Sequence, residues 1–323
     1  MKEGQFVKQN LERWEEFELL LRKGKNTNPD ELASLFIHIT DDLSYARTKY
    51  PTSETVDYLN NLALKAHQLI YRNKKESTNR FGHFWKYEVP MAVKSAHKHI
   101  AYSLLIFGIA TLIGAVSTAY DETYVRLILG DGYVNMTLEN IKNGEPMGVY
   151  GSMSQTSMFY MITVNNIGVS MKVFTYGILL PAIGTFFTLL LNGIMLGSFQ
   201  YFFVQQNLFM TSFLTIWIHG TLEISAIVIA GGAGLKAGSS ILFPDTYSRL
   251  ESFKRGVKTG LKIVIGLIPV FILAGFLESF ITRLSGMSPI LKALIIIISA
   301  FLVLYYFVIY PNKLSQDEQS GKD

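Results

Sequence analysis

The chain has 323 residues, of which 49% are hydrophobic and 17% charged, with a net charge of +4 and no cysteine. The missing cysteines exclude disulfides and thiolate metal sites, and the absence of a Lys/Arg stripe interleaved with aromatics argues against nucleic-acid binding. The charged N-terminal part has no early apolar segment, so we expect no cleavable signal peptide.

The first 75 residues are expected to form three amphipathic helices of soluble character. Apolar residues recur at helical spacing over residues 3–22, again after Pro29 and a third time after Ser53. Pro29 suits an early helical position, and Pro51 ends the second helix. We therefore predict a cytoplasmic three-helix region at residues 1–75.

Residues 76–99 are expected to be a linker followed by an interfacial helix. The aromatic residues Phe84 and Trp85 lie near its start, and the basic residues Lys98 and His99 lie directly before a long apolar segment. Amphipathic helices of this type lie in the headgroup region of a bilayer. We predict such an elbow helix, with an ordinary amphipathic helix of the soluble region as the alternative.

Apolar segments follow from Ile100 onward and predict an all-α, polytopic membrane protein, since about 20 apolar residues suffice to cross a bilayer. We place six spans at residues 100–120, 155–171, 174–204, 211–235, 261–282 and 291–310. The second is short and polar, so a re-entrant or tilted segment is the alternative there. The transmembrane domain thus covers residues 100–311, and residues 312–323 form a tail.

The charges of the connecting segments predict the orientation. The segment after the fourth span is rich in Lys and Arg, including Lys254 and Lys258, whereas the loop at residues 121–154 is acidic. Positively charged segments remain on the cytoplasmic side. We therefore expect the loop outside and both termini in the cytoplasm, in the inner membrane of a bacterium.

The few polar residues within the spans are expected at one depth. At a rise of about 1.5 Å per residue, all of them reach the middle or the outer half of the bilayer. This intramembrane polar cluster consists of Asn165, Asn166, Asn192, His219, Glu223 and Glu278. His219 and Glu223 are four residues apart and share one helix face. Ionisable residues at such depth are costly, which makes the cluster a candidate functional site.

Each member of the cluster also has a structural explanation. The asparagines could bond across helices, and His219 could be hydrogen-bonded to Glu223 or to an asparagine. Glu278 could pair with Arg283, and Glu223 could be protonated and hydrogen-bonded. Small residues are expected at close helix contacts, and we assign this role to Gly193, Gly197 and Gly220.

Metal binding and catalysis have weaker support in the sequence. His219, Glu223 and Glu278 could supply three metal ligands, although one histidine with two carboxylates is a modest case for zinc. The sequence contains no nucleophile-elbow motif and no H-E-x-x-H motif, so we expect no enzyme activity and no cofactor.

Several ordered motifs resemble one family of membrane proteins. They are Val164-Asn165-Asn166-Ile167, Leu191-Asn192-Gly193, His219-Gly220-x-x-Glu223 and Ala274-Gly-Phe-Leu-Glu278. Over residues 80–310 the chain resembles the stage II sporulation protein M family of bacterial and archaeal integral membrane proteins. The resemblance implies topology and location rather than chemistry. Its sporulation member is a membrane partner of the peptidoglycan hydrolases that thin the septal wall during engulfment.

Three functions compete at this point. The first is a membrane scaffold, or a subunit of a complex linked to envelope remodelling. The second is a transporter or channel component that uses the polar cluster, and the third is an intramembrane metal-dependent enzyme. The expected partners are the lipid bilayer, other membrane or envelope proteins and a second copy of the chain, with no nucleic acid.

Overall fold

The computed structural model describes all residues except 24–28, 73–79, 149–153, 285 and 321–323. The described residues form helices and turns without a strand, which confirms the all-α prediction. The chain divides into two compact units, Met1–Arg80 and Phe81–Asp323. The linker expected from residue 76 to the elbow helix lies largely outside the described residues.

The N-terminal unit consists of three helices packed around an aromatic core. They are α1 (Glu3–Lys23), α2 (Pro29–Lys49) and α3 (Glu54–Arg72). Trp14 and Phe17 of α1 are fully enclosed, together with Ile39 of α2 and Leu59 of α3. These apolar residues lie on one face of each amphipathic helix, so the three faces bury one another.

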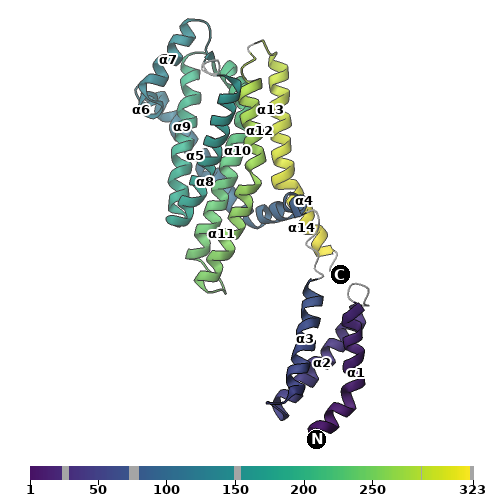
Figure 1. Cartoon of the computed structure of the whole chain (residues 1–323). Coiled ribbons are helices and arrows are strands. Elements are labelled where there is room, and N and C mark those ends of the chain that lie inside the picture. The colour runs from purple at the N-terminus through teal and green to yellow at the C-terminus, as the bar shows by residue number, and fades with distance from the viewer. Residues whose placement is uncertain (24–28, 73–79, 149–153, 285, 321–323) are drawn as a thin grey trace. The chain divides into compact units, whose positions relative to one another are not determined.

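The membrane unit contains six long helical segments (Figure 1). They are α5 (Val89–Tyr120), α8 (Gln155–Leu179), α9 (Ile183–Gln205), α10 (Phe209–Leu242), α11–α12 (Arg249–Gly266 and Ile268–Phe276, followed by the π-helical turn η4, Leu277–Ile281) and α13 (Pro289–Leu304). Five of these segments are long and apolar enough to cross a membrane, and α8 is not among them. The sixth span therefore stays a prediction.

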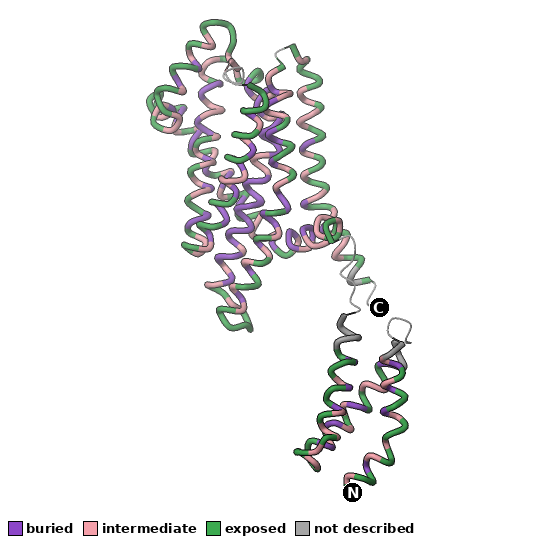
Figure 2. Tube along the Cα trace, in the orientation of Figure 1, coloured by how far each residue is buried: buried purple, intermediate pink, exposed green. Residues whose placement is uncertain are grey.

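Helix α10 is the centre of the membrane unit. Buried residues follow one another along most of its length, and it contacts α5, α8, α9, α11, α12 and α13 (Figure 2). By contrast, α13 stands at the edge of the bundle and exposes most of its apolar side chains. A helix that is enclosed on every side is where an ionisable side chain has least access to water.

Small residues allow the helices to approach closely. A Cβ built at Gly193 of α9 would lie 2.7 Å from the carbonyl oxygen of Phe107 on α5, and one at Gly197 would lie 2.8 Å from the backbone nitrogen of Ala115. The Ser103 hydroxyl of α5 donates to the carbonyl of Val228 on α10, at 2.7 Å. Close backbone contact and interhelical hydrogen bonds are the usual source of helix association in lipid.

The expected boundary between the second and third spans, at residues 171 and 174, is wrong. Helix α8 continues to Leu179, and α9 begins only at Ile183. Pro181 explains the position of the break, because its ring prevents continuation of the helix and disfavours helical geometry in the preceding residue. Ala182 completes the turn with a φ of 63°.

The fourth and fifth spans are also longer than the expected residues 211–235 and 261–282. Helix α10 continues through its glycines to Leu242, and the fifth segment begins at Arg249. The glycines do not end the helix because neighbouring helices pack onto them: a Cβ at Gly232 would lie 2.7 Å from Cα of Ile100. Packing thus outweighs the low helix propensity of glycine.

The elbow segment and the first span form one helical stretch, Arg80–Tyr120, instead of meeting at a boundary at residue 99. Short helix α4 (Arg80–His83) and the π-helical turn η2 (Phe84–Glu88) lead directly into α5. No glycine or proline lies between Pro90 and Gly108, so nothing in the sequence stops the helix.

Two hydrogen bonds join the start of this helical stretch to the C-terminal part of the chain. The hydroxyl of Tyr306, in the π-helical turn η5 (Tyr305–Ile309), donates to the carbonyl of Trp85 at 2.6 Å. The hydroxyl of Tyr310, the first residue of α14 (Tyr310–Ser320), donates to the carbonyl of Lys86 at 2.9 Å. The tail expected at residues 312–323 is thus helical up to Ser320.

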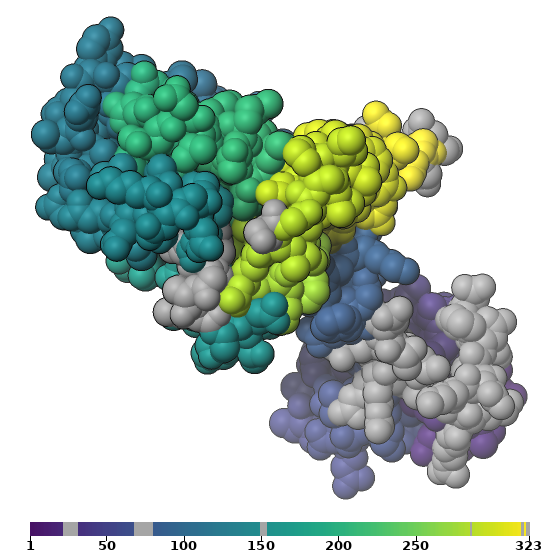
Figure 3. All heavy atoms as spheres, turned by 90° about the horizontal axis from the view of Figure 1, so that it is seen from above, coloured from purple at the N-terminus to yellow at the C-terminus, as the bar shows by residue number. Residues whose placement is uncertain are grey.

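The segment expected as an outer loop contains two short helices, α6 (Tyr124–Leu129) and α7 (Asp131–Lys142). Val125 and Val134 pack against Phe202 and Phe203 at the end of α9. Seen from this end of the molecule, α6 and α7 form one edge of the face and α13 lies at another (Figure 3). Ile128, Leu129 and Tyr133 of these helices line the central cavity described below.

Candidate functional site

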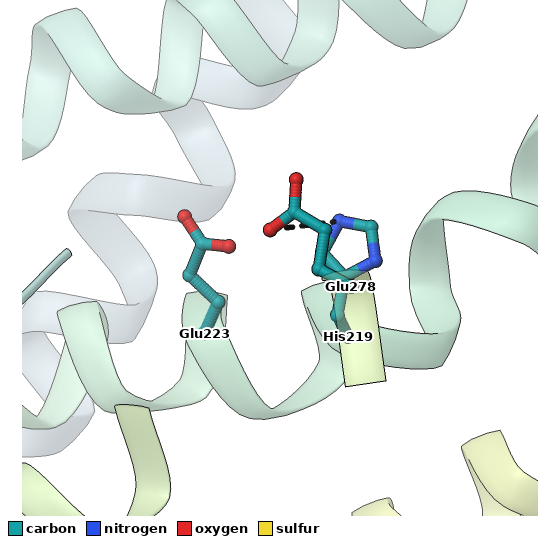
Figure 4. Close-up of side chains that lie close together, drawn as sticks. All are labelled: His219, Glu223 and Glu278. Atoms are coloured by element: carbon teal, nitrogen blue, oxygen red, sulfur yellow. Dashed lines mark ion pairs between the residues drawn. The ribbon is translucent and has the colours of Figure 1, made fainter. Parts of the chain in front are cut away.

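Three ionisable side chains of the predicted cluster meet inside the membrane unit. His219 and Glu223 project from successive turns of α10, and Glu278 reaches the same space from η4 (Figure 4). One ligand atom from each of the three lies within 4.8 Å of the other two. Nε2 of His219 lies 3.8 Å from a carboxylate oxygen of Glu278, with the two side chains only 6% and 15% exposed.

The imidazole of His219 lies between two residues that are four apart on the facing segment. Its Nδ1 lies 3.1 Å from the hydroxyl of Thr282, and its Nε2 faces Glu278. Residues at this spacing share one helix face, so a single segment holds both edges of the ring. Thr282 was not expected in the cluster, although its position four residues after Glu278 was a usable signal.

A π-helical turn positions this face. The backbone N–H of Thr282 donates to the carbonyl of Leu277 five residues earlier, at 2.8 Å, in place of the four-residue bond of an α-helix. Such turns within α-helices are frequent at functional sites. The turn contains Glu278, and its C-cap is Thr282, the residue that contacts His219.

The three asparagines lie at the border of the same space. Asn166 of α8 is 5% exposed; its side-chain amide faces Glu223 but makes no hydrogen bond of standard geometry through Nδ2. Asn192 of α9 donates to the carbonyl of Thr188 on its own helix, at 2.8 Å. Asn165 is exposed. The structure thus brings all six predicted residues to one region, with Asn192 held by its own helix.

Two cavities meet at the carboxylates. The larger has a volume of about 460 Å³, and its polar lining consists of Asn165, Asn166, Asn192, His219, Glu223, Glu278 and the Tyr133 side chain. The smaller, of about 380 Å³, is lined by Met161, Ile162, Asn165, Asn166, Glu223 and Glu278. Glu223 and Glu278 therefore border both spaces.

No lysine or arginine lines either cavity in the described part of the chain. The basic side chains of Arg283 and Lys292 line a third cavity of about 540 Å³, which they share with Thr282. Glu278 approaches His219, and its pairing with Arg283 stays a prediction. Two partly buried carboxylates thus face each other, with one buried imidazole and the side chains of asparagines around them.

The three glycines expected at helix contacts differ from one another. Gly193 and Gly197 lie against the backbone of α5, as described above. Gly220 instead lines the larger cavity, and a Cβ built there would meet only Ile216 and Ile224 of its own helix, at 3.8 Å. Because glycine has no side chain, space stays open beside His219. Gly220 therefore does not form the close helix contact that was expected of it.

A helical bundle with five apolar spans and an enclosed group of ionisable side chains defines an integral membrane protein. The sequence model of the family described as Stage II sporulation protein M matches residues 103–283, more than half of the chain. The chain belongs to this family, which confirms the resemblance seen in its motifs. Residues 4–72 match a second family, described as Domain of unknown function (DUF8413).

The family match contains every member of the cluster, from Asn165 to Glu278, and also Thr282. The comparison with curated proteins gave no match, and neither did the comparison with solved structures.

Proposed function

We propose that this protein binds a cation inside the bilayer and moves it, as a transporter or as the ion-conducting subunit of a membrane complex. The observation that carries this proposal is the pair of enclosed carboxylates, Glu223 and Glu278, which border two cavities with no lysine or arginine lining them in the described residues. Carboxylates at such depth require a proton, a metal ion or another cation as partner.

The arrangement of polar side chains around the two carboxylates also supports a pathway for the cation rather than an isolated binding site. Thr282 lines the third cavity and contacts His219, which approaches Glu278; Glu278 and Glu223 then border the two cavities near α8. Each step joins groups that can exchange a proton or share a cation. A chain of this kind is typical of ion pathways in pumps and transporters.

The proposed setting is the cytoplasmic membrane of a bacterium, with both termini in the cytoplasm. The charge distribution supports this orientation: Lys254, Lys258 and Lys262 belong to α11, at the end of the bundle opposite α6 and α7 (Figure 1). The opposite end contains Asp131 and Glu139 of α7. Self-association and envelope-protein partners belong to the same proposal.

The test uses the full chain reconstituted in vesicles with a pH-sensitive or a metal-sensitive dye inside. We expect cation entry that is lost in Glu223→Gln and retained in Glu251→Gln, a change of an exposed carboxylate paired with Arg255 at 2.8 Å. Equal flux in the wild type, in Glu223→Gln and in empty vesicles would contradict the proposal.

A second candidate is a membrane scaffold for envelope enzymes, and one observation favours it. The N-terminal unit has its own aromatic core and its own family match, so it is suited to bind a partner independently of the membrane helices. Purification of the tagged full chain from its own membranes tests this: a wall enzyme recovered near stoichiometrically, and lost when residues 1–75 are deleted, would support it. A homo-oligomer without other proteins would count against it.

A further inference from the structure

The tautomer of His219 makes the cluster more specific than a general cation site. The hydroxyl of Thr282 donates to the carbonyl of Leu277 at 3.2 Å, so its oxygen remains to accept the Nδ1–H of His219. We assign the neutral ring on this basis, with the proton on Nδ1. Its Nε2 lone pair then faces the carboxylate oxygens of Glu278, which are also electron-rich.

Two electron-rich atoms that face each other at 3.8 Å repel each other unless a proton or a cation lies between them. We propose that His219, Glu223 and Glu278 form a binding site for a divalent first-row metal cation of the zinc class, with Nε2 and one oxygen of each carboxylate as ligands. This inference rests on the proposed function and names its cation.

Charge balance favours a divalent cation over a monovalent one. A neutral imidazole and two carboxylates carry a charge of −2, and no lysine or arginine lines the cavities to offset it in the described chain. A divalent cation makes the site neutral, whereas Na⁺ or K⁺ would leave one negative charge enclosed at high cost. Two protons would also balance the charge, and the experiment below separates that case.

The distances fit a small contraction around a metal ion. Ligand atoms about 2.0–2.2 Å from tetrahedral zinc lie about 3.3–3.6 Å from one another. The three candidate atoms lie within 4.8 Å of one another. Side-chain rotations that move these atoms by about 1 Å would bring them to the spacing of zinc ligands. Since His219 and Glu223 lie on adjacent turns of one rigid helix, only Glu278 must approach from another segment.

The ligand types favour zinc and its neighbours over the common hard cations. Mg²⁺ and Ca²⁺ prefer six or more oxygen ligands, whereas an imidazole nitrogen with two carboxylates suits zinc and its neighbours. Three protein ligands leave a fourth position for water or another ligand, and all three candidate residues line the cavity of about 460 Å³. An open position permits the exchange that a transport site requires.

Neighbouring residues supply the support that metal ligands usually have. The bond from Nδ1 to Thr282 fixes the orientation of the ring, and the amide of Asn166 faces the carboxylate of Glu223. Hydrogen bonds from outside the ligand set orient histidine and carboxylate ligands, and their loss typically lowers metal affinity about 10–100-fold. Thr282 is therefore proposed as a positioning residue of this site.

The experiment measures zinc bound by the purified full chain after removal of metals with a chelator. We expect one Zn²⁺ per chain, and at least about 100-fold weaker binding in His219→Gln, Glu223→Gln and Glu278→Gln. Thr282→Val should weaken binding about 10–100-fold, and Glu251→Gln should leave it unchanged. The visible spectrum of the Co²⁺-loaded protein should show tetrahedral coordination that Glu278→Gln abolishes.

A second measurement, the melting temperature with and without Zn²⁺, tests the site in proteins that keep all three ligands, so it does not depend on the folding of the ligand variants. Zn²⁺ should raise the melting temperature of the wild-type protein and of Glu251→Gln, because a ligand of the native state stabilises it. Absence of stoichiometric zinc in the wild type would overturn the inference, as would undiminished binding in Glu223→Gln and Glu278→Gln. If zinc is absent but Glu223→Gln still abolishes proton entry into vesicles, the proposed function stands with protons as its cation. If zinc binds and no flux occurs, the site stands and transport fails.

Discussion

The two units of this protein hold their helices together by different means. In the N-terminal unit, large apolar side chains such as Trp14, Phe17 and Leu59 fill the space between helices. In the membrane unit, glycines such as Gly193 and Gly197 bring helix backbones into contact. Apolar burial drives association in water, but it gives little advantage in lipid, where close contact and hydrogen bonds act instead.

The treatment of buried polar groups differs as well. In the N-terminal unit, Asp42 accepts hydrogen bonds from Arg13 at 2.6 Å and from the indole of Trp14 at 2.8 Å. Apart from Nε of Arg13, every unpartnered buried side-chain atom found in the described residues belongs to the membrane unit. One of these atoms, Nδ2 of Asn166, belongs to the cluster. Unpaired polar atoms where they cost most indicate a site kept for function rather than for stability.

The largest expected effect comes from filling a glycine contact. Gly197→Leu should abolish the folded membrane unit, because the new side chain would collide with the backbone of α5 near Ala115. Gly108→Leu on α5 is the matched control, since nothing lies within 4 Å of a Cβ built there. Thermal unfolding in detergent measures both. Similar melting temperatures for the two variants would show that close backbone contact is not what joins these helices.

Truncation of the aromatic core comes next. Trp14→Ala should destabilise the N-terminal unit by about 3–5 kcal/mol, through loss of a large buried side chain and of its bond to Asp42. Limited proteolysis of the full chain should then cleave this unit and spare the membrane helices. Leu19→Ala, at a position that is 60% exposed, should leave cleavage unchanged. Equal cleavage in both variants would contradict a core centred on Trp14.

A pair of threonines tests the unpaired polar groups. The Thr163 hydroxyl is buried without a hydrogen-bond partner, whereas that of Thr185 donates to the carbonyl of Val173 at 2.9 Å. Thr163→Val should raise the free energy of unfolding by about 1 kcal/mol, and Thr185→Val should lower it by about 1 kcal/mol. Chemical unfolding in mixed micelles measures the difference. If both substitutions changed the free energy of unfolding in the same direction, the hydrogen-bond status of the two threonines would not explain their effects.

The smallest effect concerns Glu3. Hydrogen bonds from Ser53 and Thr55 favour the charged form and lower the pKa of Glu3 below its usual value. Its stabilising contribution is therefore complete above the ordinary glutamate pKa and is lost as the pH falls through the lowered folded-state pKa. Glu3→Gln should flatten this acid-side dependence in the thermal unfolding of the N-terminal unit. A wild-type and a variant pH profile of the same shape would exclude the contribution.

Periodicity and composition predict most of this fold. Hydrophobic length indicates the membrane segments, and Pro29 and Pro51 indicate helix ends near the observed ones. The errors arise where tertiary packing decides. The glycines of α10 resemble a helix end in sequence, but the neighbouring helices cover them and the helix continues to Leu242. Pro181 marks the turn between α8 and α9, about ten residues after the boundary expected at residue 171.

Depth arguments from the sequence place the members of the cluster at one level, and the structure brings His219, Glu223 and Glu278 within reach of one another. Depth alone gives no information about rotation around a helix axis. For that reason the sequence did not distinguish Asn192, held by its own helix, from Asn166, which faces Glu223. The contribution of Thr282 depends on a π-helical turn, whose five-residue hydrogen bond has no clear sequence pattern.

The bonds from Tyr306 and Tyr310 to Trp85 and Lys86 have a consequence for biosynthesis. The ribosome makes the acceptor carbonyls more than two hundred residues before the tyrosines. At a translation rate of about 5–20 residues per second, roughly 10–45 s pass between synthesis of the elbow segment and synthesis of the two tyrosines. During that interval the segment lacks both of these hydrogen bonds. Assembly of this unit is therefore completed only when translation of the last span is finished.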